Sequence, residues 1–304
     1  MLLHNDKDLF KEVIYSTSAE LGLPVPIVEK DYYVTVILKE LSEKATGCVF
    51  KGGTVLSKCY HAIDRFSEDI DIAFSNKLTQ GERKKLKNKT IAGISADLGL
   101  PIVDWEKARS RRDYNCYTFS YSPIEGAVPD SLIQGVKMEV ALGSISFPTV
   151  LLDVDSYVYQ YLSRDNMDIA NEYGLRPFPM TLQTVERTFV DKVFAVCDYY
   201  MQGRLKRHSR HLYDIYMLFP MVKQDKDLKI LVHQVRGLRA DMAICPSAKA
   251  GIDIPGILKR IIEEKVYMED YESITSYFQN QPLVYDKAIT ALAQIAESDI
   301  FEEK

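Results

Sequence analysis

The sequence predicts an α+β protein, in which an N-terminal domain built around a mixed sheet is followed by a helical C-terminal domain. Segments that alternate polar and apolar residues, as a half-buried strand does, lie in the first half of the chain. From about residue 182 onward the apolar residues recur at the spacing of amphipathic helices. The segment 174–181, with a glycine and two prolines, separates the two patterns. We therefore place the domains at 1–178 and 179–304.

Two helices and a strand open the chain in this interpretation. Residues 6–22 form an amphipathic pattern, and a second helical pattern at 27–43 follows the break GLPVP. The run at 48–53 is typical of a short buried strand that ends in a glycine turn, and a helix over 54–63 begins directly at that turn.

The remaining elements follow from the same two periodicities. Strands are predicted at 68–74, 114–122 and 135–143, and helices at 79–98, 182–203 and 207–222. The segment 156–162 fits either a strand or a short helix.

The composition is that of a soluble globular enzyme, with 46% hydrophobic and 27% charged residues in a chain of 304. The five cysteines are scattered, without a CxxC pair or a zinc-like spacing, so we expect reduced thiols. No signal peptide is apparent, and no apolar stretch approaches the roughly 20 residues of a membrane span. We therefore expect a cytoplasmic protein with no membrane partner.

The net charge of −5 does not by itself indicate a protein that binds nucleic acid. Basic residues are nevertheless concentrated in three segments: Arg83, Lys84, Lys85, Lys87 and Lys89; Lys107, Arg109, Arg111 and Arg112; and Arg204, Lys206, Arg207 and Arg210. Each cluster alone fits a solvated face. Together, in an acidic chain, they make a polyanionic substrate plausible.

A glycine turn that opens a helix is the first candidate binding element. Gly52 and Gly53 lack a β-carbon, so a phosphate group can approach their backbone closely. The helix that starts at Thr54 directs its free N–H groups toward the turn, which favours an anion there. Thr54 and Ser57 can add hydroxyl donors and Lys58 a positive charge, so the turn suits a nucleoside triphosphate.

Two aspartates two residues apart on a predicted strand are the second candidate element. Asp69 and Asp71 project from one face of the strand, while Ile70 and Ile72 point to the core. Adjacent carboxylates repel one another unless a cation lies between them, and oxygen ligands at this spacing suit Mg²⁺ or Mn²⁺. Glu139, between apolar neighbours on another strand, is the best candidate for a third metal ligand.

Together these motifs resemble the signature of the nucleotidyltransferases in the AbiEii/AbiGii toxin family, which includes the MenT toxins of mycobacteria. The resemblance begins with Gly52-Gly53-Thr54 and Ser57-Lys58, and continues through residues 65–71, RFSEDID. It extends to VEKDYYV at 28–34, to VERTFVDKVFAV at 185–196 with Lys192, and to RHSRHLYDIYML at 207–218 with Arg210 and Asp214. Residues from about 28 to 218 are covered.

The resemblance implies a polymerase-beta-like fold and transfer of a nucleotide from an NTP to an acceptor by the toxin of a type IV toxin–antitoxin system. It implies catalytic roles for Asp69, Asp71, Glu139, Lys192 and Asp214, and adds Arg65, Ser67 and Lys192 to the residues that bind the nucleotide. The acceptor is the 3′ end of tRNA in some members, and GTP binding is reported for others. A separately encoded antitoxin is a possible partner. Asp31 matches a family position, but the sequence does not specify its role.

Several alternatives stay open at this point. Lys192 also fits a solvated helix lysine, and Arg210 with Asp214 also fits a surface pair four residues apart. The acceptor is RNA in the leading hypothesis, because the basic clusters favour it. The acidic net charge favours a protein or small-molecule acceptor. A non-catalytic nucleotide-binding regulator is a third possibility, against which the intact glycine turn and carboxylates argue.

Overall fold

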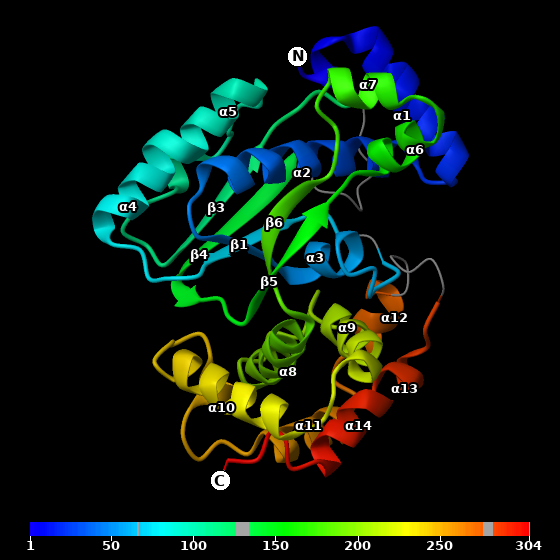
Figure 1. The fold of residues 1–304 in the computed structure, drawn as a ribbon. Coiled ribbons are helices and arrows are strands. Elements are labelled where there is room, and N and C mark those ends of the chain that lie inside the picture. Colours follow the sequence, from blue (N-terminus) through cyan, green and yellow to red (C-terminus); the bar gives the residue numbers. More distant parts are fainter. Residues whose placement is uncertain (66, 126–133, 276–281, 304) are drawn as a thin grey trace. The chain divides into compact units, whose positions relative to one another are not determined.

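The computed structural model describes residues 1–65, 67–125, 134–275 and 282–303, and within them the strands form one six-stranded sheet (Figure 1). The strands are β1 (Cys48–Lys51), β2 (Ile70–Phe74), β3 (Tyr114–Phe119), β4 (Val136–Ile145), β5 (Thr149–Val154) and β6 (Phe178–Gln183). Their order is β3-β4-β2-β1-β6-β5. The β2–β4 and β1–β6 pairs are parallel and the others antiparallel, which confirms the predicted mixed sheet.

The chain divides into two compact units. Unit 1 comprises Met1–Cys59 and Ser67–Gln183, and unit 2 comprises Tyr60–Phe66 and Thr184–Lys304. Unit 1 contains the sheet, whereas the regular elements of unit 2 are all helical over the described residues, as the predicted fold class requires.

The helices of unit 1 are α1 (Lys7–Leu21), α2 (Val25–Lys44), α3 (Gly52–Lys58), α4 (Gln80–Lys85), α5 (Ala92–Leu98), α6 (Tyr157–Asp165) and α7 (Met167–Glu172). A π-helical segment, Leu86–Ile91, joins α4 to α5. Helix α2 packs on β4 and β6, and α1, α5 and α6 pack on α2 (Figure 1). The buried side chains of Tyr32, Ile37 and Phe50 belong to this core.

The helices of unit 2 are α8 (Val185–Met201), α9 (Arg210–Leu218), α10 (Lys226–Ala240), α11 (Ile254–Glu264), α12 (Met268–Ser273), α13 (Tyr285–Ala288) and α14 (Thr290–Glu297). Helix α8 packs against α9, α10 and α11, with Phe189 and Phe194 fully buried. Among the residues that the structure describes, no helix is long and apolar enough to cross a membrane.

Strands β5 and β6 and the end of α3 differ from the sequence prediction. Strands β5 and β6 are not anticipated, because Pro179 within β6 suggests a break rather than a strand. Helix α3 ends at Lys58 instead of residue 63, and the following residues, Tyr60–Phe66, belong to unit 2. The segment that fits either a strand or a helix is the helix α6, whose first turn is capped by the Ser156 hydroxyl.

Candidate active site

The two aspartates lie where β2 begins. Asp69 immediately precedes the strand and Asp71 is its second residue, while Ile70 and Ile72 are buried, as the alternation predicts. The parallel strand β4 places Glu139 directly opposite Asp71 in the register. Because paired residues of neighbouring strands point to the same face of a sheet, Asp71 and Glu139 share the half-exposed face.

Lys137 lies on the same face of β4, two residues before Glu139, and sequence reasoning did not single it out. Its ammonium group forms an ion pair with the Glu139 carboxylate. It also lowers the pKa of Asp69, although burial and the neighbouring Asp71 charge outweigh it and raise that pKa to about 6. The acidic face therefore already includes a positively charged side chain, that of Lys137.

The donor atoms of this face fit a hard divalent cation. Asp69 Oδ1 is buried and meets no hydrogen-bond partner among the described residues, which is costly for a carboxylate oxygen. In the described part of the chain, however, no group of three or more acidic, histidine or cysteine side chains is already arranged to hold a metal ion. Glu139 is turned to Lys137 instead. The three carboxylates are thus placed on one face without converging.

Gly52 is required by the position of Asp71. It adopts a φ of 85°, and a β-carbon built on it would lie 2.0 Å from Asp71 Oδ2. The antiparallel pairing of Lys51 with Asp71 brings the carboxylate to this place. The glycine turn and the aspartate pair, which sequence reasoning treats as separate motifs, are therefore parts of one arrangement.

The hydroxyl groups of the glycine-turn helix are engaged inside the turn. Thr54 is buried, and its Oγ1 donates to the Asp69 carbonyl oxygen at 2.5 Å and lies 3.0 Å from Ser67 Oγ. Ser57 Oγ donates to the Thr54 carbonyl oxygen at 3.2 Å. The Thr54 contacts fix the first turn of α3 to the chain that enters β2, and Gly53 is partly exposed beside them.

Ion pairs from α2 hold both segments that carry the candidate residues. Lys30 pairs with Glu68, which directly precedes Asp69. Asp31 pairs with Lys58, the last residue of α3, at 2.5 Å. The Lys58 ammonium, which sequence reasoning assigns to a triphosphate, is therefore already bonded to a carboxylate.

Unit 2 brings together three other predicted site residues around the fully buried carboxylate of Asp214. Arg65 donates to it in a bidentate manner, Nε to Oδ1 and Nη2 to Oδ2 at 2.7 Å each, and Lys192 Nζ donates to Oδ2 at 2.6 Å. The two cations hold the pKa of Asp214 well below its usual range, although burial opposes them. Burial also lowers the pKa of Lys192. The Arg210 side chain, by contrast, is exposed.

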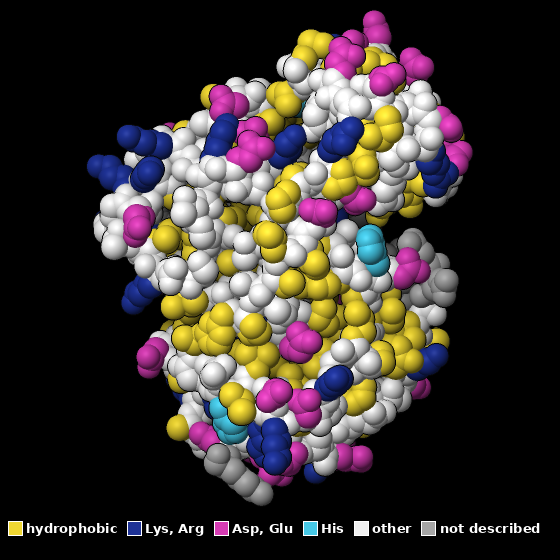
Figure 2. Space-filling view, in the orientation of Figure 1, with side chains coloured by type: hydrophobic (Ala, Val, Ile, Leu, Met, Phe, Trp, Pro, Cys, Tyr) yellow, Lys and Arg dark blue, Asp and Glu magenta, His cyan; other side chains and the backbone are white. Residues whose placement is uncertain are grey.

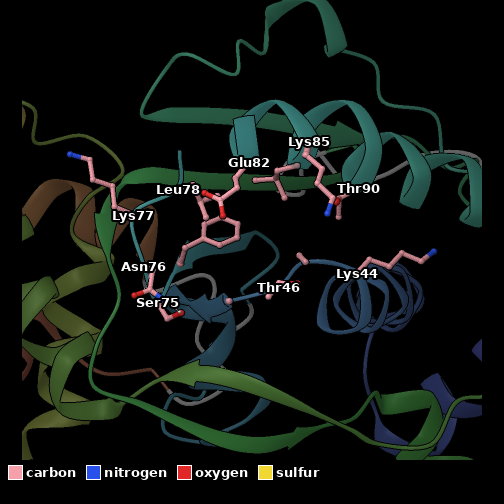
Figure 3. Close-up of a pocket in the computed structure, with 13 residues that line it drawn as sticks. Lys44, Thr46, Ser75, Asn76, Lys77, Leu78, Glu82, Lys85 and Thr90 are labelled. Atoms are coloured by element: carbon pink, nitrogen blue, oxygen red, sulfur yellow. Dashed lines mark hydrogen bonds between the residues drawn. The ribbon is translucent and has the colours of Figure 1, made fainter. Parts of the chain in front are cut away.

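A pocket of about 350 Å³ lies in unit 1 at the end of β2 away from Asp71 (Figure 3). Residues 44–47 and 74–78, together with α4 and the π-helical segment after it, line this pocket. Lys85 reaches in beside Thr90, whereas Lys77 extends away from Lys44 (Figure 3). Since no candidate catalytic residue lines this pocket, we do not assign it to the reaction.

We expect the substitution Gly52→Ala to destabilise the protein more than Gly22→Ala. Both glycines have a positive φ, but a β-carbon at Gly22 meets nothing within 4 Å. Gly22→Ala should therefore cost about 1 kcal/mol for backbone strain alone. Gly52→Ala should cost about 1–3 kcal/mol more, because the Asp71 carboxylate must move. Urea denaturation followed by Trp105 fluorescence measures both, and equal losses would contradict the assigned contact.

We expect Asp69→Asn to stabilise the metal-free protein in a pH-dependent way. A carboxyl group whose pKa is raised on folding favours the folded state below its unfolded pKa, and this contribution is lost as the pH rises through the folded value of about 6. The variant should thus match the wild type near pH 4 and exceed it by on the order of 2 kcal/mol above pH 6. The exposed Asp165→Asn is the control. A difference independent of pH would contradict this expectation.

Comparison with protein families identifies the chain. The family model described as "nucleotidyl transferase AbiEii toxin, type IV TA system" matches residues 36–287, well over half of the chain. A search of curated proteins finds no match. The glycine turn and the aspartates both lie within the matched region, and so do Lys192 and Asp214. The chain therefore belongs to the AbiEii family of nucleotidyl transferase toxins of type IV toxin–antitoxin systems.

Proposed function

We propose that this nucleotidyl transferase is metal-dependent and transfers a nucleotide from an NTP to RNA, with the 3′ end of tRNA as the acceptor. The observation that carries the proposal is the shared face of Asp71 and Glu139 beside the partnerless Asp69 Oδ1, next to the glycine turn. A carboxylate face of this kind needs a cation, and the glycine backbone accepts the close approach of a phosphate.

The metal ligands in this proposal are Asp69, Asp71 and Glu139, with Mg²⁺ or Mn²⁺ as the ion. A bound divalent ion would neutralise phosphate charge and favour deprotonation of the attacking hydroxyl. The triphosphate lies against Gly52 and Gly53. Because α3 has only seven residues, close approach to the glycine backbone matters more here than the dipole of the helix.

The reaction is a displacement at the α-phosphorus of the NTP. The hydroxyl oxygen of the acceptor forms a bond to this phosphorus, the bond to the oxygen bridging to the β-phosphate breaks, and pyrophosphate leaves with that electron pair. The hydroxyl proton passes to solvent. The protein contributes position and charge rather than a covalent intermediate.

The roles proposed for unit 2 follow from the contacts of Asp214. Asp214 holds Arg65 and Lys192 in fixed positions by three hydrogen bonds of 2.6–2.7 Å. Arg65 lies four positions before Asp69 in the sequence. The family resemblance assigns Arg65 and Lys192 to nucleotide binding, and in this proposal Asp214 is the residue that orients both cations. Ser67 and Ser57 add hydroxyl groups near the glycine turn.

An exposed basic surface on unit 1 supports RNA as the acceptor. Lys84, Lys85 and Lys89 are exposed, and lysine and arginine side chains gather over α4 (Figure 2). The exposed residues Arg109, Arg111 and Arg112 continue this surface, since Lys87 Nζ donates to the Ala108 carbonyl oxygen at 2.7 Å. Not every basic residue contributes, because Arg83 is buried and pairs with Asp113. A protein or small-molecule acceptor would not require such a surface.

The decisive experiment is incubation with each α-³²P-labelled NTP and total bacterial RNA, followed by separation of RNA from protein. We expect the label in the RNA fraction, and we expect Asp71→Asn to reduce it at least about 100-fold, because this variant keeps the shape but removes a metal-binding charge. The exposed Asp165→Asn should retain full transfer. Label on protein would favour the alternative acceptor, and no labelling by any NTP would favour a non-catalytic regulator.

The basic surface can be tested separately from the chemistry. The double variant Lys84→Glu/Lys85→Glu should weaken RNA binding about tenfold at low salt and reduce its salt dependence, because fewer phosphate contacts release fewer counterions. Its affinity for NTP should not change. The variant Lys7→Glu/Lys11→Glu, with the same change in charge at exposed positions of α1, is the control. Equal RNA binding by both variants would contradict the proposed role of this surface in binding RNA.

A further inference from the structure

Three consecutive charged residues of α2 are buried, and the proposed function uses none of them. Glu29, Lys30 and Asp31 are 2%, 1% and 8% exposed. Charged side chains are seldom buried without partners, and three in succession on a helix point in three different directions. Each therefore contacts a different part of unit 1.

Asp31 uses both oxygens of its carboxylate. Oδ1 accepts a hydrogen bond from Lys58 Nζ at 2.5 Å, and Oδ2 accepts one from the backbone N–H of Tyr157, the first residue of α6, at 2.8 Å. Asp31 thereby ties the end of α3 and the beginning of α6 to α2.

Lys58 is enclosed by the same residues. Its side chain is 6% exposed, and its ammonium lies 5.9 Å from the centre of the Tyr157 ring, within the range of a cation–π contact. To reach a phosphate, the ammonium would have to leave Asp31 as a buried, unpaired carboxylate, which costs several kcal/mol.

We propose that Asp31 and Lys58 are positioning residues, which fix α3 and thereby the glycine turn, and that Lys58 does not contact the nucleotide. This inference rests on the proposed function, because it assumes that the triphosphate lies against Gly52 and Gly53. It assigns a role to Asp31, which sequence reasoning leaves without one.

Because α3 is short, a change in the position of Lys58 also changes the position of the glycine turn at the other end of the helix. Seven residues of helix span only about 10 Å, so a shift of Lys58 displaces the whole element. The other end of α3 is held by the bond from Thr54 Oγ1 to the Asp69 carbonyl oxygen and by the contact of Gly52 with Asp71. The Asp31–Lys58 pair thus holds the end of α3 that lies opposite the glycine turn.

A double-mutant cycle separates positioning from phosphate contact. Lys58→Met leaves the Asp31 carboxylate unpaired, and Asp31→Asn leaves the Lys58 ammonium unpaired. The double variant Asp31→Asn/Lys58→Met buries no charge, keeps the volumes similar, and retains an oxygen that can accept from Tyr157 N–H. A neutral replacement of a buried ion pair is often tolerated, whereas loss of one partner is not.

The measurement is calorimetric binding of the four α,β-methylene nucleoside triphosphates, at a temperature at which every variant is folded by circular dichroism. We expect each single variant to bind the preferred analogue at least tenfold more weakly than the wild type, and the double variant to bind within about threefold of it. Arg164→Met, which breaks an exposed ion pair with Glu20, should bind like the wild type.

Three outcomes would overturn this inference, and only one of them would also overturn the proposed function. Equally weak binding by Lys58→Met and the double variant would show that Lys58 contacts the nucleotide. Unchanged affinity in both single variants would reduce the pair to a structural role without influence on the site. No binding of any analogue by the wild type would overturn the proposed function, and this inference with it.

Discussion

The contact between the Asp71 carboxylate and the Gly52 backbone is the constraint on which the candidate site depends. A β-carbon at position 52 would lie 2.0 Å from Asp71 Oδ2, so this position has to be a glycine. The antiparallel register of β1 with β2 aligns Lys51 with Asp71, and a slip of one residue would turn Asp71 toward the core. The residue type, the strand register and the start of α3 are therefore linked. The Gly52→Ala substitution tests all three at once.

The distribution of charge in unit 1 follows from the cost of burying it. Lys30 is paired with Glu68 and Lys58 with Asp31, and Lys137 is paired with Glu139 on the sheet face. Asp69 Oδ1 differs from these groups, because it is buried without a hydrogen-bond partner in the described structure. Its raised pKa has the same origin, since burial and the Asp71 charge both disfavour the ionised form. These properties of Asp69 support the cation site that we propose here.

The sequence predicts most of the fold because its periodicities are strong, but local pattern cannot supply the partners of charged side chains. The alternation at 68–74 places Asp71 and the buried isoleucines correctly, and the helices at 6–22 and 27–43 are confirmed as α1 and α2. Strand β6 is missed because Pro179 is typical of a break in a strand. What makes the segment a strand is its pairing with β5, whose residues lie elsewhere in the sequence, and a local pattern does not reveal that pairing. The roles proposed for individual site residues stay predictions.

Three lysines that look equivalent in the sequence illustrate this limit. Each donates to a carboxylate, Lys58 to Asp31, Lys137 to Glu139 and Lys192 to Asp214. The partner of Lys137 is two residues away, that of Lys192 is 22 away, and that of Lys58 is 27 away. The Asp31 carboxylate is buried, so displacing Lys58 would leave it, among the described residues, with only the Tyr157 N–H as a donor. Asp214 is also buried, but it would keep its bidentate bond from Arg65 if Lys192 were displaced. Glu139 is half-exposed, and its pair with Lys137 lies on the open sheet face, where water lowers the cost of separating the charges. Of the three pairs, the one at Glu139 is therefore the least costly to separate, and Glu139 is also the residue that pairs in register with Asp71.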